Sequence, residues 1–209
     1  LDAALEKNQS RRAMGLLMDP HTGAILALAT RPAFDPNNYM DYDASLRRNA
    51  AIIDTFEPGS AFKIVTAAAA LEHGLITPSD PIDCMGGRFN PYGHTIRDTH
   101  PMRVASFREC FAVSSNIAMI KVAALLGPDR MEQWIRRFGF GVPTGIELPG
   151  EEPGIFRPQK QWSRLSMGSL PMGQEISVNM LQLARAFSVI ANGGYLVKPH
   201  LVDEVRGED

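Results

Sequence analysis

The sequence predicts an α/β protein of the α+β type, in which a β-hairpin precedes a long helical stretch. Two short apolar runs, residues 14–18 and 24–29, are separated by a turn that contains Pro20 and Gly23, and this pattern is typical of a hairpin. Both strands are apolar on both faces, so we expect helices to cover each face. The clearest helical patterns lie at residues 64–74, 117–126 and 178–191.

Length and composition set broad limits. The chain has 209 residues, 44% hydrophobic and 21% charged, which is enough for one domain with a real core. The formal charge of −2 gives no electrostatic reason to expect a nucleic-acid partner. No apolar run is long enough to cross a bilayer, and the chain opens without Met or a signal peptide, so we interpret it as a piece of a longer protein. Cys84 and Cys110 could form one disulfide or remain two thiols.

The remaining segments follow from local signals. Ser177 is the expected cap of the last helix, which Asn192 and the two glycines after it should end. A run of Pro, Gly, Asn and Asp predicts irregular chain over several stretches. The other expected elements are the end of a helix at 1–10, loops at 31–54, 76–101 and 141–154, helices at 102–111 and 130–138, and the start of a strand at 195–205.

Ser60 and Lys63 form the most informative pair of residues. They come just before the run at residues 64–74, which is predicted to be a helix that ends at Gly74. Ser60 then falls at the N-cap or first turn, and Lys63 lies one turn on, over the same edge. A serine hydroxyl becomes a nucleophile when a base lies within reach, and a neutral lysine can be that base. Burial and the positive end of a helix would both lower the lysine pKa. The alternative is that Ser60 only caps the helix and Lys63 is solvated.

A second motif is Ser114-Ser115-Asn116, at the junction of two predicted helices. The Ser114 hydroxyl could pass protons, and the Asn116 amide could hold a peptide-like substrate. The alternative is that both serines cap the helix that follows. For a similar triplet, Ser177-Val178-Asn179, we expect only the capping role.

Ser-x-x-Lys followed by Ser-x-Asn resembles the pattern of penicillin-recognising serine enzymes. Longer segments narrow the resemblance to class B penicillin-binding proteins, of the septal or sporulation type more than the elongation type. These segments occur in the family's order and span nearly the whole chain: residues 18–27, 48–63, 144–151 and 173–194.

The resemblance implies a penicillin-binding-protein or serine β-lactamase-like fold, with a mainly antiparallel sheet flanked by helices and an all-helical lobe. It implies a peptidoglycan D,D-transpeptidase in which Ser60 attacks the D-Ala-D-Ala stem peptide, Lys63 is the base, Ser114 relays the proton and Asn116 holds the substrate amide. Ser115, Gly173 and Gln174 are the further substrate-binding candidates. Within a partial transpeptidase domain, we expect residues 1–30 to hold the helix end and hairpin, 55–194 the helical lobe, and 195–209 the start of another strand.

The same resemblance implies the partners: stem peptides on a lipid-linked precursor, β-lactams and other wall-synthesis proteins, with no nucleic acid. We expect no cofactor and no metal. The catalytic domain should lie outside the cytoplasm, held at the cell membrane by an N-terminal anchor that this chain lacks.

One departure from the family pattern affects the function. The family's third motif, Lys-Thr/Ser-Gly, occurs nowhere in the chain, so we interpret the chain as C-terminally truncated and expect it to be inactive alone. Two alternatives remain on the same scaffold: a β-lactam hydrolase, or a non-catalytic β-lactam sensor or scaffold.

Overall fold

The computed structural model describes residues 1–91 and 93–207. They divide into two compact units. The hairpin unit comprises residues 1–56, 142–154 and 178–207, and the helical unit comprises residues 57–141 and 155–177. Helices and antiparallel strands occur together, so the predicted α+β class is confirmed.

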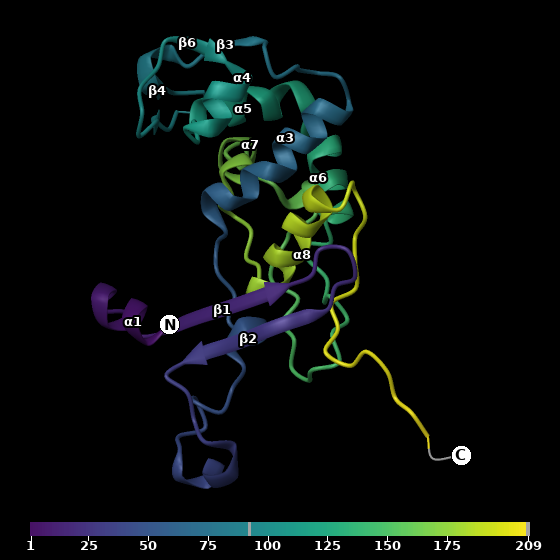
Figure 1. The fold of residues 1–209 in the computed structure, drawn as a ribbon. Coiled ribbons are helices and arrows are strands. Elements are labelled where there is room, and N and C mark those ends of the chain that lie inside the picture. The colour runs from purple at the N-terminus through teal and green to yellow at the C-terminus, as the bar shows by residue number, and fades with distance from the viewer. Residues whose placement is uncertain (92, 208–209) are drawn as a thin grey trace. The chain divides into compact units, whose positions relative to one another are not determined.

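The hairpin unit is built on β1 (Ala13–Met18) and β2 (Ile25–Arg31), which pair antiparallel with Leu16 opposite Leu28. They lie side by side in Figure 1, after the short helix α1 (Asp2–Asn8). Leu16, Met18 and Ile25 pack against a small cluster formed by Ile52, Ile146 and Leu181.

The expectation that both faces of the hairpin are covered is wrong for the described chain. Leu17 is 58% exposed and Leu26 is 64% exposed. Strand residues alternate between faces, so Leu16 and Met18 pack inward on one face while Leu17, between them, points to the other. The apolar composition of the strands therefore overestimates their burial.

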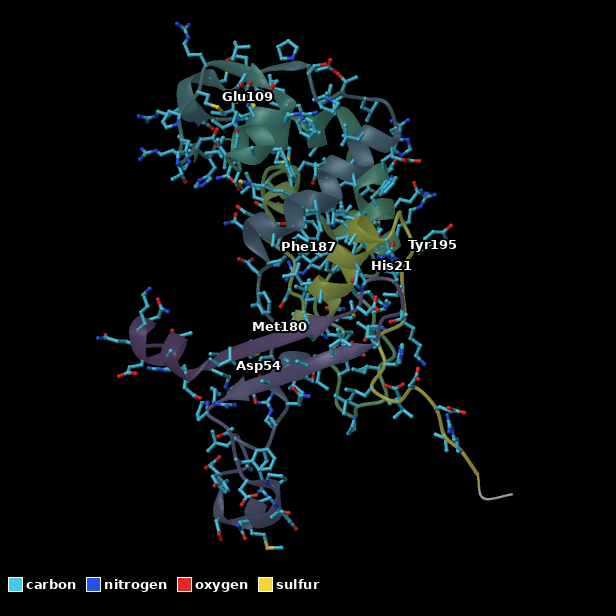
Figure 2. The ribbon with its side chains drawn as sticks, in the orientation of Figure 1. His21, Asp54, Glu109, Met180, Phe187 and Tyr195 are labelled. Atoms are coloured by element: carbon cyan, nitrogen blue, oxygen red, sulfur yellow. The ribbon has the colours of Figure 1, made fainter. Side chains whose placement is uncertain are left out.

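Two helices complete this unit: α2 (Ala50–Ile53) and α8 (Met180–Ala191). Met180 and Phe187 mark the course of α8 in Figure 2. The cap of α8 is Asn179, not Ser177: its side chain accepts the Gln182 N–H at 2.7 Å, and the Gln182 side chain accepts the Asn179 N–H at 3.0 Å. Ser177 instead forms a bridge with Ile155 in the helical unit.

The helical unit packs α3 (Lys63–Glu72), α5 (Asn116–Leu126) and α6 (Pro128–Arg137) around a closed core. Alanines make α3 a strong helix former with little bulk, and it contacts both α5 and α6. Core side chains such as Phe62, Ile120 and Ile135 are at most 1% exposed. The helices predicted over 64–74, 117–126 and 130–138 are confirmed to within two residues at each end.

Short elements surround this core. The segment 76–101, predicted as loop, contains short strands, and the helix predicted over 102–111 is a strand followed by a shorter helix. These elements are β3 (Pro81–Asp83), paired with β6 (Val104–Ser106); β4 (Arg88–Phe89), paired with β5 (Ile96–Arg97); α4 (Phe107–Ala112); and α7 (Ser166–Ser169).

The units differ from the predicted boundaries. The expected helical lobe, 55–194, is interrupted, because residues 142–154 and α8 belong to the hairpin unit, where Leu181 joins the apolar cluster. Residues 195–207 form no strand, only a parallel bridge between Ala24 and His200. In the described residues, no helix combines the length and apolar character needed to cross a membrane.

Candidate functional site

Ser60 and Lys63 enter α3 through a tight turn, the 3-10 helix η2 (Gly59–Phe62). Gly59 takes a positive φ of 55° that glycine adopts without strain. Phe62 is buried, with its ring 5.2 Å from that of Phe140. This anchor leaves Ser60 exposed to solvent, while Lys63, one turn later, is only 2% exposed.

The Lys63 ammonium points at the second motif. Its Nζ donates to the Ser114 carbonyl at 2.6 Å, to Ser114 Oγ at 2.9 Å and to Asn116 Oδ1 at 2.7 Å. These three acceptors match the three N–H groups of a lysine. Ser60 and Asn116 line one pocket, although no hydrogen bond joins Ser60 Oγ to Lys63 Nζ in the described part of the chain.

Burial lowers the pKa of Lys63 from 10.5 to about 8, because an ammonium loses hydration there. The nearby carboxylate of Asp98 acts in the opposite direction and raises it. At pH 7, a group with this pKa is neutral in about a tenth of molecules. A neutral Lys63 can accept the proton of a serine hydroxyl, so the geometry and the pKa together suit a general base.

The Ser114–Asn116 turn is conformationally unusual. Ser114 has a φ of +60°, in the left-handed region that few non-glycine residues adopt. This conformation lets Ser114 present both its carbonyl and its hydroxyl to Lys63. Strained residues of this kind persist where their surroundings hold them, and they are frequent at functional sites.

The three candidate substrate-binding residues take different positions. Ser115 is buried, and its hydroxyl caps α5 by accepting the Ala118 N–H at 3.0 Å. This placement differs from the expected substrate contact. Gln174 lines the pocket that contains Ser60.

Gly173 supports the turn that carries Ser60. Its carbonyl accepts the Gly59 N–H at 3.1 Å. A Cβ at position 173 would overlap the Gly59 carbonyl oxygen and lie 2.7 Å from the Gly59 nitrogen, and the φ of Gly173 is +75°. The absence of a side chain therefore allows the two backbones to meet.

Sequence reasoning missed Asp98, His94 and Arg97. Asp98 Oδ2 accepts the Ser115 hydroxyl at 2.6 Å, and the two basic residues line the pocket. The pocket has a volume of ≈ 320 Å³ and is lined by Gly59, Ser60, His94, Thr95, Ile96, Arg97, Asn116, Met172 and Gln174. No motif marks residues 94–98, and only the fold brings them to the second motif.

The two cysteines lie beside Ser115. Cys84 and Cys110 are buried free thiols with their Sγ atoms 3.5 Å apart. Cys84 Sγ is also 3.7 Å from Ser115 Oγ. Burial, together with Cys84, raises the pKa of the Cys110 thiol from 9.0 to about 12. Of the two possibilities left open by the sequence, the structure contains the two thiols.

Residues 13–208 match the family model described as the penicillin binding protein transpeptidase domain. The chain belongs to this transpeptidase family. The family assignment agrees with the resemblance found in the sequence motifs, and a sporulation protein is among the relatives.

Curated relatives span nearly all of the chain. It is 36% identical over 197 residues to the probable peptidoglycan D,D-transpeptidase PbpC of Pseudomonas aeruginosa, covering 94% of this chain and 35% of the relative. It is 36% identical over 211 residues to penicillin-binding protein PbpB of Mycolicibacterium smegmatis, covering 100% of this chain and 32% of the relative. Stage V sporulation protein D of Bacillus subtilis is 33% identical, covering 98% and 32%. The chain thus spans about a third of the length of these relatives.

Solved structures of transpeptidases show the same fold. Penicillin binding protein 3 of Mycobacterium tuberculosis, complexed with aztreonam, has a TM-score of 0.88 and 33% identity, covering 95% of this chain and 45% of that one. The apo transpeptidase domain of Burkholderia pseudomallei penicillin-binding protein 3 has a TM-score of 0.86 and 30% identity, covering 96% and 56%.

Proposed function

We propose that the full-length protein is a serine-type peptidoglycan D,D-transpeptidase and a target of β-lactams. The observation that carries this proposal is the position of Lys63, whose Nζ binds Ser114 and Asn116 one helical turn after the exposed Ser60. The names of the transpeptidase relatives, and the β-lactam complexes of a solved neighbour, support it.

In the proposed reaction, Ser60 Oγ attacks the carbonyl carbon between the two D-Ala residues and its proton passes to neutral Lys63. The peptide C–N bond then breaks, and the leaving D-Ala takes the proton from Lys63 through the Ser114 hydroxyl. The acyl group stays on Ser60 as an ester. An amine of a neighbouring stem then attacks the ester, a new amide forms, and Ser60 regains its proton. Asn116 and Gln174, which line the pocket beside Ser60, would hold the donor peptide.

The setting of the protein is part of the same proposal. Its substrates would be stem peptides on a lipid-linked precursor outside the cytoplasm, with a membrane anchor elsewhere in the full-length protein. Other wall-synthesis proteins would be its partners.

The pocket favours transfer over β-lactam hydrolysis. None of the described residues that line it carries a carboxylate, so no acid side chain there can activate water against the ester. The Ser60 ester would then react only slowly with water and would last long enough for an amine to attack it.

The test is acylation of the full-length protein by fluorescent penicillin between pH 6 and 9.5. We expect the second-order rate to rise with pH through about 8, where Lys63 loses its proton, and Ser60→Ala to abolish labelling. Labelling of Ser60→Ala would overturn the proposal. Rapid turnover of nitrocefin would instead indicate a hydrolase, and stable acylation without cross-linking of stem peptides would indicate a sensor.

A further inference from the structure

Asp98 is a buried carboxylate whose surroundings identify a role. Asp98 comes directly after β5 and is only 8% exposed. No ion pair in the described part of the chain includes it. A buried charge of this kind is expensive unless hydrogen bonds compensate it. The backbone also fixes its position, because the Asp98 N–H donates to the Gly87 carbonyl at 3.2 Å.

Within the described residues, the hydrogen bonds of its side chain all go to the start of α5. Oδ1 accepts the backbone N–H groups of Asn116 at 2.6 Å and Ile117 at 3.1 Å, and Oδ2 accepts the Ser115 hydroxyl at 2.6 Å. The first N–H groups of a helix have no partner within the helix. The Ser115 hydroxyl accepts the Ala118 N–H, so the carboxylate and this hydroxyl together satisfy the first turn of α5.

The same contacts orient the catalytic candidates. Asn116 is held at its backbone by Asp98 and at its side chain by the Arg97 carbonyl, which accepts from Nδ2 at 3.2 Å. With Nδ2 engaged there, Oδ1 is turned toward Lys63. Ser114 is the neighbouring residue in the left-handed conformation, and such strain needs support from the residues around it.

We propose that Asp98 is a positioning residue for proton transfer at Ser60: it holds the 114–116 turn so that the oxygens of Ser114 and Asn116 converge on Lys63 Nζ. This inference rests on the proposed function and adds a residue outside the two motifs. Asp98 touches neither Ser60 nor the pocket, so it acts through the residues that it holds.

Asp98 also acts on Lys63 through its charge. The groups that bind Nζ, from Ser114 and Asn116, are neutral, and His94 and Arg97 line the pocket from the β5 side. Asp98 is the charged group that raises the pKa of Lys63 against the effect of burial. Removing this charge therefore makes Lys63 easier to deprotonate, while removing the contacts loosens the turn. The loss of charge changes the midpoint of the pH profile, and the loosened turn lowers the plateau rate.

The test compares the acylation rates of two full-length proteins, the Asp98→Asn variant and the unsubstituted parent, across pH 6 to 9.5. We expect the high-pH plateau rate to fall about 10- to 100-fold, the size of effect that misplaced catalytic groups produce. We also expect the midpoint of the pH profile to move to lower pH. Asp80→Asn is the matched control, because in the described chain the Asp80 side chain accepts hydrogen bonds from Thr77 alone, in the same unit, and does not line the pocket. It should change neither value.

Ser115→Ala separates geometry from charge. It removes the contact to Oδ2 and keeps the carboxylate, so the plateau rate should fall by less and the midpoint should stay. A parent-like plateau and midpoint in folded Asp98→Asn would overturn the inference, even if its melting temperature fell. If Asp98→Asn does not fold, a parent-like plateau in Ser115→Ala overturns it. Labelling of Ser60→Ala would instead reject the proposed function, so the two failures are distinguishable.

Discussion

The helical unit and the hairpin unit bury their apolar side chains to different extents. In the helical unit, Ile120, Ile135 and Phe62 are essentially inaccessible to solvent. In the hairpin unit, Leu17, Phe187 and Ile190 line an open groove of ≈ 450 Å³, and all three are exposed. All four candidate catalytic residues belong to the well-buried helical unit. A tightly packed core can hold a catalytic constellation in place, and the open strand face holds none of it.

The largest expected effect is from truncation of the helical core. Ile120→Ala should lower the local free energy of unfolding by about 2–5 kcal/mol, because it removes buried methylenes and leaves a cavity. Leu17→Ala in the hairpin should lower it by less than about 1 kcal/mol, since that side chain is already mostly in water.

Hydrogen exchange of the full-length protein, resolved on peptides that span α5 and β1, measures both values. Equal losses for the two variants would show that the two units do not differ in packing.

The next effect concerns the cysteines. We expect Cys84 and Cys110 to react with a thiol reagent at pH 8 about 100-fold more slowly than a cysteine placed by Leu17→Cys in the hairpin. A local opening of about 3 kcal/mol gives this ratio, and the raised pKa of Cys110 keeps its thiol protonated.

The same shift predicts a pH effect on stability. The pKa of Cys110 is about 12 in the folded protein and 9.0 for an ordinary thiol, so its contribution to the free energy of unfolding is complete below pH 9 and is lost between pH 9 and 12. Rapid labelling of both thiols in folded protein would contradict this account.

The smallest effect is at the helix caps. Here we expect the larger loss of stability in the hairpin unit and the smaller one in the helical unit. Asn179→Ala should destabilise α8 by about 1–2 kcal/mol, because its buried amide also donates to the Glu152 carbonyl at 2.8 Å. Ser106→Ala should cost about 0.5–1 kcal/mol, since its capping box with Glu109 is exposed. Thermal unfolding compares the two; a costlier Ser106→Ala would show that burial does not govern cap strength here.

Sequence patterns predict those features of the site that depend only on residues close together in the chain. Ser60 and Lys63 are three apart on one helix start, so their spacing alone indicated a shared edge. The cap of α8 was misassigned to Ser177, although Gln182 three residues after Asn179 forms the capping-box spacing. That signal was present in the sequence.

Other features depend on contacts between distant segments. Asp98 is 17 to 19 residues from the groups it binds, and nothing in the spacing distinguishes it from the other aspartates. The exposure of Leu17 likewise depends on which segments pack on the hairpin, and an apolar run carries no such information.

The backbone at position 114 restricts which alcohol can serve there. Threonine carries the same hydroxyl as serine, but its branched Cβ fits poorly at a φ of +60°. Glycine would accept that backbone but would supply no oxygen to Lys63. Chain conformation, and not only chemistry, therefore selects serine at this position beside Lys63.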